Sequence, residues 1–309
     1  MSALSEKLQP IFKLFARSQE VARKLPLHKR PEIERISRGL PEFAPRLMKK
    51  RGPGTEFFEV RPYNHGDDPR RIHPRQSAKK GHDMVIEKEA EISQHFYIWR
   101  DMRAAMNFES GKAPYTPRDA ADIMILAIAK HLARYDEKVG LIDGDRLLQG
   151  GRAAEMLAAQ MAGQKEDNSG NLNIRSKLVQ HSTALLFSDF MMPPETLEKS
   201  LSRLQKMGIG GWLIMVADPQ LIEFEYAGDV LFYGPCGEGE KQFDRADSKK
   251  LRSDYRKALK GRLDWLETTA KSKGFELIIQ RTDQDLHQGL RALYNIAPKI
   301  PESIKKMEV

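Results

Sequence analysis

Two aspartates that directly follow apolar runs are the residues of this sequence best placed to do chemistry. Asp101 ends the run HFYIWRD, and Asp189 ends the run ALLFSD. Each run has the length and apolar character of a buried strand. Ligands of open α/β sheets bind at the carboxyl ends of the strands, and Mg²⁺ prefers hard oxygen ligands such as carboxylates. We therefore expect both aspartates at the ligand-binding edge of one sheet.

Patterns of the common enzyme classes are missing from the sequence. The eight histidines form no H-E-x-x-H motif and no i,i+4 pair, which a zinc site on a helix would require. The chain has no Walker A motif, no G-x-S-x-G elbow and no G-x-G-x-x-G after a strand,. A single cysteine, Cys236, excludes an intrachain disulfide and a site with several cysteine ligands,. These observations favour a protein that is not an enzyme.

Strand and helix patterns alternate from residue 84 onward and would form the sheet that carries the two aspartates. The alternation predicts an α/β fold, with a mainly parallel sheet and helices on both faces. The predicted strands are 84–89, 95–101, 139–143, 184–189, 211–218 and 275–280, and the predicted helices are 118–135, 153–162, 194–207, 248–273 and 283–294.

A helical and extended segment precedes this core. Residues 3–24 predict an amphipathic helix that is interrupted or begins afresh at Pro10, and we expect its apolar face to dock on the core,. Residues 25–53 are rich in proline, glycine and basic residues, which predicts a connector with at most one short helix near 31–39,.

The basic charge of the chain is concentrated in its N-terminal quarter. Residues 1–80 contain 19 Lys and Arg against 9 Asp and Glu, whereas the remainder contains 32 against 34. Such a region suits an acidic protein, an anionic membrane surface or nucleic acid. The marks of specific nucleic-acid modules are absent, so we expect no specific nucleic acid, while peripheral membrane contact stays open. No signal-peptide block and no apolar run of membrane-spanning length is present, and we expect a cytoplasmic protein,.

Residues 54–80, GTEFFEVRPYNHGDDPRRIHPRQSAKK, combine a short strand with a Gly-Asp-Asp turn between basic residues. Glycine supplies a positive φ at such a turn, and aspartate accepts hydrogen bonds from nearby backbone amides. The flanking arginines can form forked contacts with the two carboxylates and hold the segment rigid. The segment is either a structural clamp or a surface that binds a partner directly. We call it the hallmark clamp and assign to it Glu56, Phe57, Arg61, Tyr63, Gly66, Asp67, Asp68, Arg70, Arg71 and Ser77.

This stretch closely resembles the hallmark G-x-E-F-x-x-x-R-x-Y-x-x-G-D-D-x-R-x-I-x-W-x-x-S-A of the domain-of-unknown-function family DUF58. Members of that family are bacterial proteins with a von Willebrand factor A-like core. Pro74 stands where the family usually has tryptophan. The matching positions are Gly54, Glu56, Phe57, Arg61, Tyr63, Gly66, Asp67, Asp68, Arg70, Ile72, Ser77 and Ala78.

The resemblance implies a von Willebrand factor A-like, Rossmann-like fold with a metal-ion-dependent adhesion site. In that site an Asp-x-Ser-x-Ser loop, a threonine and a second aspartate hold Mg²⁺. Here Arg103 and Ala105 replace the two serines after Asp101, and the region at 150–152, where a threonine is expected, has none. We therefore expect a degenerate adhesion site made of Asp101, Arg103, Ala105, Ser188 and Asp189.

Arg103 leads to a specific hypothesis about that site. The substitution removes a metal ligand and adds a fixed positive charge that competes with the ion. We expect Arg103 to reach Asp189 or Asp101 and to act as an internal cation. No metal or other cofactor is expected; Mg²⁺ is disfavoured, and if any metal binds, Asp101 and Asp189 are its ligands. Otherwise Arg103 points to solvent and the two aspartates only cap helices.

Family resemblance also implies a partner, because members are commonly encoded beside MoxR-type AAA+ ATPases. We expect a non-catalytic, chaperone-like adaptor that helps such an ATPase to mature or remodel a client complex. The expected organisation is a basic helix and connector at 1–53, the hallmark clamp at 54–83 packed on the core, a von Willebrand factor A-like domain at 84–297 and a tail at 298–309.

Two alternatives from other classes stay open. The chain would be a metal-dependent hydrolase if Asp101, Asp189 and a nearby histidine bound a metal. It would be an anionic membrane or nucleic-acid binder if residues 1–51 carried its function. The client and the oligomeric state do not follow from the sequence.

Overall fold

The computed structural model describes residues 3–26, 57–64, 68–88, 94–174, 178–237, 239–295, 299–300 and 304. The chain forms two compact units. One unit comprises residues 1–44 and 94–309, and the other comprises residues 45–93. Each unit is described by itself below.

A five-stranded sheet forms the centre of the larger unit. Every neighbouring pair of strands in it is parallel. The predicted α/β fold is therefore confirmed, with a parallel sheet of the Rossmann or von Willebrand factor A type. The strands, in spatial order, are β4 (Lys138–Leu141), β3 (His95–Arg100), β5 (Thr183–Ser188), β6 (Gly210–Ala217) and β9 (Phe275–Arg281).

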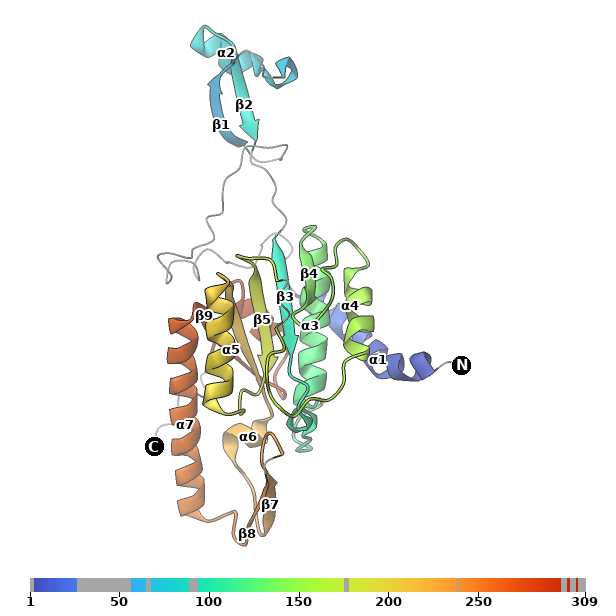
Figure 1. Ribbon diagram of the computed structural model, residues 1–309, viewed down its shortest axis with the longest axis vertical. Coiled ribbons are helices and arrows are strands. Elements are labelled where there is room, and N and C mark those ends of the chain that lie inside the picture. The colour runs from blue at the N-terminus through green and yellow to red at the C-terminus, as the bar shows by residue number, and fades with distance from the viewer. Residues whose placement is uncertain are drawn as a thin grey trace. The chain divides into compact units, whose positions relative to one another are not determined.

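Helices cover both faces of this sheet (Figure 1). Side chains alternate along each strand, so that Ile98 packs into one core cluster while Tyr97 and Trp99 pack into the other,. The first cluster lies under α3 (Pro117–Ala133), α4 (Ala153–Ala162) and α8 (His287–Ala292), and the second lies under α5 (Pro194–Lys206) and α7 (Lys249–Ser272).

Helix α3 is buried on nearly all sides because it lies between the sheet and the N-terminal helix α1 (Ala3–Arg23). The amphipathic helix predicted at 3–24 therefore docks on the core through Ile11, Val21 and Ala22. The expected interruption at Pro10 was wrong, since α1 continues through it. A proline inside a helix removes one backbone hydrogen bond, and in α1 the turns after Pro10 pack on α3.

The strand order creates a switch point between β3 and β5. After β3 the chain crosses to β4 on one side, and after β4 it crosses back to β5 on the other side. The crevice at the carboxyl ends of strands flanking such a point is where open α/β sheets bind ligands. Asp101 and Asp189 directly follow β3 and β5, so the structure places both at this crevice.

A small hairpin lies beyond the carboxyl ends of the strands (Figure 1). It follows the short helix α6 (Pro219–Glu223) and consists of β7 (Val230–Tyr233) and β8 (Glu240–Phe243). Phe232 packs against the rings of Phe224 and Tyr226 at 5.7 and 4.9 Å between centroids. Neither strand of this hairpin was predicted from the sequence.

The smaller unit contains an antiparallel pair, β1 (Phe57–Pro62) and β2 (Met84–Lys88), with a 3-10 helix at Pro69–Arg71 and the helix α2 (Pro74–Lys80). We had placed the strand at 84–89 in the core domain, but β2 pairs with β1 and the parallel sheet starts at β3. The predicted packing of residues 54–83 on the core stays a prediction. The connector at 27–53 lies outside the described residues.

The described helices differ from membrane-spanning helices. In the part of the chain that the structure describes, none of them combines the length and the apolar character needed to cross a bilayer.

Candidate functional site

Arg103 lies at the centre of a buried cluster at the switch point. Its side chain has no exposed surface. Nε donates to both carboxylate oxygens of Asp101 at 3.2 and 3.0 Å, and Nη2 donates to Asp101 Oδ2 at 2.6 Å. The Arg103 backbone amide also donates to Asp101 Oδ1 at 3.0 Å. The short loop after β3 thus folds the arginine back onto the aspartate two residues before it.

Asp189 and Ser188 bring the end of β5 into the same cluster. Arg103 Nη2 forms an ion pair with Asp189 Oδ1 and lies 3.3 Å from Ser188 Oγ. The Ser188 hydroxyl donates to Asp101 Oδ2 at 2.6 Å. One guanidinium therefore joins two strands that are separated by more than 80 residues in the chain, as the hypothesis about Arg103 expected.

The backbone after β5 is ordered by the same two side chains. Ser188 Oγ accepts from the amide of Phe190 at 2.8 Å, and Asp189 Oδ1 accepts from the amide of Met191 at 2.9 Å. Arg262 of α7 donates to the carbonyl oxygens of Phe190 and Met192. A second cation is thereby held close to Asp189.

The loop after α4 covers the cluster. Asn168 Oδ1 accepts from the amide of Ala104 at 2.8 Å, and the amide of Asp167 donates to Met102 O at 3.1 Å. Gly170 has a φ of +64°, and a Cβ there would lie 3.3 Å from Arg103 Cδ and 3.0 Å from Met192 Cβ. A larger residue at this position would press on Arg103, so the glycine allows the loop to close directly over the arginine.

The cluster holds more negative charge than Arg103 alone neutralises. Burial lowers the pKa of Arg103, but Asp189 and Asp101 outweigh burial, and the net result is a raised pKa and a permanently charged guanidinium. Burial raises the pKa of Asp189 against the attraction of Arg103. Two carboxylates face one guanidinium in direct contact, and Arg262 supplies further positive charge to Asp189.

The residues present do not fit a Mg²⁺ ion. Oxygens of Asp101, Ser188 and Asp189 converge as ligands of a hard cation would. Arg103 Nη2 lies within hydrogen-bonding distance of all three, however, and therefore fills the point at which they converge. A divalent ion there would have to displace a buried guanidinium that makes its ion pairs with the same oxygens.

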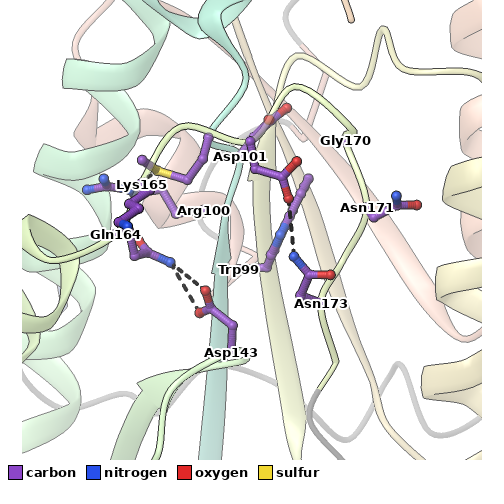
Figure 2. Close-up of a pocket in the computed structure, with 11 residues that line it drawn as sticks. Trp99, Arg100, Asp101, Asp143, Gln164, Lys165, Gly170, Asn171 and Asn173 are labelled. Atoms are coloured by element: carbon purple, nitrogen blue, oxygen red, sulfur yellow. Dashed lines mark hydrogen bonds between the residues drawn. The ribbon is translucent and has the colours of Figure 1, made fainter.

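A polar hollow of about 100 Å³ lies beside the cluster (Figure 2). Gln164 and Asp143 point toward each other across it, with Gln164 Nε2 donating to Asp143 Oδ1 and Oδ2 at 3.1 and 3.0 Å. Trp99 and Asp101 form part of its wall. The hollow therefore lies at the carboxyl ends of β3 and β4, next to the switch point.

One sequence expectation about this site needs correction. Residues 150–152 were expected near the metal position, but they precede α4 and lie by the start of β4, where Gln149 Nε2 donates to Asp136 O at 3.0 Å. The loop at 163–174, after α4, reaches the cluster instead. Ala105 lies in a 3-10 helix, Ala104–Asn107, where its carbonyl oxygen accepts from the amide of Phe108.

Several residues of the cluster were missed by sequence reasoning. Gly170 and Pro235, whose carbonyl oxygen accepts from Arg103 Nη1 at 3.3 Å, come from separate loops. Arg118 donates to Arg103 O at 2.8 Å, and Arg262 comes from the other face of the sheet. Gly170 lies within a polar loop and had a weak signal as a turn residue. Arg118 and Arg262 had no such signal, because they resemble ordinary helix-surface arginines.

The hallmark clamp is described only in part. Asp68 accepts from the amide of Arg70 at 3.0 Å and caps the 3-10 helix. Ser77 Oγ donates to His73 O at 3.0 Å and accepts from the amide of Met84 at 2.8 Å, which joins α2 to β2. The Arg61 side chain donates to Pro62 O at 3.0 Å. Glu56, Gly66 and Asp67 lie outside the described residues, so the expected Arg–Asp forks stay a prediction.

The described residues contain no group of three His, Cys, Asp or Glu side chains placed to hold a metal ion.

The parallel sheet, its helices on both faces and the aspartates at its switch point define an α/β protein of the von Willebrand factor A-like class. The sequence profile described as "Protein of unknown function DUF58" matches residues 59–263, and the chain belongs to this family. No curated protein matches the chain.

Proposed function

We propose that this chain is a non-catalytic protein-interaction module with a degenerate adhesion site. The observation that carries the proposal is the place of Arg103 Nη2, which fills the point where the oxygens of Asp101, Ser188 and Asp189 converge. A site closed by its own cation has no open coordination position for substrate or water, which a catalytic metal requires. The module binds partners through its surface and performs no chemistry of its own.

The proposed partner is a MoxR-type AAA+ ATPase, with which the chain matures or remodels a client complex. Membership of the DUF58 family supports this assignment through the gene association described above. In this division of labour, the ATPase supplies the nucleotide chemistry and this chain supplies recognition. The arginines of the hallmark clamp are candidate contacts for an acidic face of the ATPase, and such contacts weaken as salt screens them.

Co-purification of this chain with a MoxR-type ATPase tests the proposal. The native chain is expected to retain the ATPase at low salt, and reversal of Arg70, Arg71 and Arg75 to glutamate is expected to release it. A matched control reverses three exposed cations of α5, Lys199, Arg203 and Lys206, and is expected to retain the ATPase. Retention that is unchanged by the first triple reversal would refute the docking role of the clamp.

A hydrolytic function would need a different state of the cluster. Asp101 and Asp189 would have to release Arg103 before they could hold a metal, and the guanidinium would need another buried partner. No feature of the described residues favours that exchange. We therefore propose the adaptor in preference to the hydrolase.

A further inference from the structure

The N-terminal half of α7 is an exposed but firmly held part of the fold. The buried residues of this 24-residue helix are Leu259, Leu266 and Ala270, so none lies in its first ten positions. Tyr255 holds this half in place, because its hydroxyl donates to Leu221 O at 2.6 Å and its ring stacks on Phe224 at 4.1 Å. The half-helix is therefore fixed in direction while most of its surface faces solvent.

Five cations on this half-helix form two parallel rows. Lys249, Arg256 and Lys260 follow the spacing i, i+7, i+11, and Lys250 and Lys257 begin a second row with the same spacing. All five are exposed. Eleven residues of helix rise roughly 16 Å, so the rows extend over about three turns. The result is a basic face of defined length, which we call the α7 basic face.

Among the described residues, no carboxylate forms a direct ion pair with these five cations, although Arg256 lies near enough to Glu225 to help lower the pKa of that carboxyl. Farther along the same helix, Lys271 pairs with Glu267 at 2.7 Å in the ordinary i,i+4 arrangement. Within the described ranges, none of the five cations of the α7 basic face makes such an ion pair. The charge of this face is thus available to an external anion.

Their placement also opposes the helix dipole. The amino end of a helix carries partial positive charge, and lysines there destabilise the helix. Lys249 and Lys250 occupy the first turn of α7, and no acidic residue is present in that turn. Folding of this chain alone therefore does not explain why the cations are concentrated at this end.

Gly261 gives an independent indication that something approaches this face. It continues the second row, at i+11 from Lys250, in the middle of the helix. Glycine inside a helix is unfavourable, and a Cβ added at Gly261 would meet no atom within 4 Å. Packing within the chain does not require glycine here, whereas close contact with a partner backbone would.

We propose that the α7 basic face docks an acidic segment of a protein partner, rich in Asp and Glu. The positive charge of this face favours an anionic partner. Two acidic residues on the same exposed side, Asp254 and Asp264, indicate which class of anion fits. A polypeptide can place its own polar or basic side chains opposite these two carboxylates, whereas a phosphodiester backbone is repelled by them. The exposed residues of α7 include no aromatic or large apolar side chain, which base stacking or membrane insertion would use,.

Fluorescence anisotropy of a labelled peptide that alternates pairs of glutamate with serine tests this docking surface in the full-length chain. Reversal of Lys249, Lys257 and Lys260 to glutamate is expected to weaken peptide binding by about tenfold or more. The same variant is expected to keep or raise its melting temperature, because acidic residues at the start of a helix favour the dipole. A loss of affinity without a loss of stability separates docking from misfolding.

Matched controls distinguish peptide binding at the α7 basic face from attraction by the net charge of the protein. Reversal of Lys199, Arg203 and Lys206 on α5 changes the net charge equally and is expected to change affinity by less than about twofold. Gly261→Gln, which adds a side chain without changing charge, is expected to weaken peptide binding as well.

Three results would overturn the proposal. One is an equal loss of affinity in the two triple variants, and another is native-like peptide binding by both Gly261→Gln and the α7 reversal. The third is tighter binding of an oligothymidylate or of phosphatidylserine vesicles than of the peptide, with release of that ligand by the α7 reversal. Because the assay contains no ATPase, its outcome is independent of the proposed partnership.

Discussion

Arg103 makes the two aspartates of the switch point compatible with burial. Taking charges out of water is costly, and a buried ion pair only balances that cost when its geometry is good and its remaining atoms are hydrogen-bonded. Here Asp101 receives hydrogen bonds from Arg103 Nε, Nη2 and the backbone amide as well as from Ser188. Loss of the arginine would leave two carboxylates facing each other without a counter-ion.

We therefore expect Arg103→Met to destabilise the protein by about 3–5 kcal/mol, the usual result of breaking a buried pair by removing one partner. Urea denaturation at neutral pH measures the change. Arg203→Met, at an exposed position of α5, serves as the control and should alter the free energy of unfolding by no more than about 0.5 kcal/mol. Equal effects of the two substitutions would show that Arg103 does not support the cluster.

Asp122 on α3 gives the second prediction at this scale. It accepts from Arg100 Nη1 at 3.2 and 3.1 Å. Burial raises the pKa of Asp122 to about 6, against the attraction of Arg100 and Arg118. The folded protein therefore holds a proton here that the unfolded chain releases from about pH 4. The stabilising contribution of this group is present below about pH 4 and is lost as the pH rises to about 6.

Asp122→Asn removes this titration. The native chain should lose stability relative to the variant as the pH rises from about 4 to about 6, with no further relative change above that range. Urea denaturation of both proteins across this range measures the difference. A difference that stays constant with pH would contradict the raised pKa.

The sequence predicted the central residues of the cluster but not the residues around them. Asp101 and Asp189 were predictable because each ends an apolar strand, and strand ends meet at one edge of a parallel sheet. Arg103 was predictable because it stands where the family has a ligand. Gly170 and Pro235 reach the cluster through loops, and the path of a loop depends on long-range contacts that no local pattern records.

At the scale of elements, local patterns predicted the parallel strands and the long helices well, since their apolar spacing is a strong signal. The pairing of β2 with β1 was missed because a short alternating strand does not specify its neighbour,. The apolar run Val230–Tyr233 before a turn rich in Gly and Pro was a hairpin signal that went unused,. Helix α2 has no buried residue, so its periodicity was too weak to predict it.

Two glycines show how the surrounding element sets the effect of one substitution. Gly211 of β6 has a φ of +155°, and a Cβ there would come within 1.9 Å of Ala184 O on β5. Gly261 of α7 is helical, and its Cβ would contact nothing. Gly261→Ala should therefore stabilise the protein by about 0.5–1 kcal/mol, whereas Gly211→Ala should destabilise it by more than that. Thermal unfolding compares the two, and a stabilising Gly211→Ala would contradict the close strand contact.

The whole molecule carries a charge of +8, and its distribution matters more than its total. The charges of residues 81–309 nearly cancel. Their sum gives no sign of the α7 basic face, because acidic residues elsewhere in this range offset its cations. Summed charge therefore pointed only to the N-terminal quarter, whereas the fold reveals a second basic surface. That surface follows from the positions of the cations on the exposed side of α7, where they form no direct ion pair with the described residues.

Titration of the native chain with Mg²⁺ and Mn²⁺ by isothermal calorimetry tests the central claim about the molecule most directly. If Arg103 is the permanent cation of the switch point, neither ion should give a saturable heat at millimolar concentrations. Saturable binding that is lost when Asp101 and Asp189 are both changed to alanine would contradict the account, because those two carboxylates would then hold a metal and not the arginine.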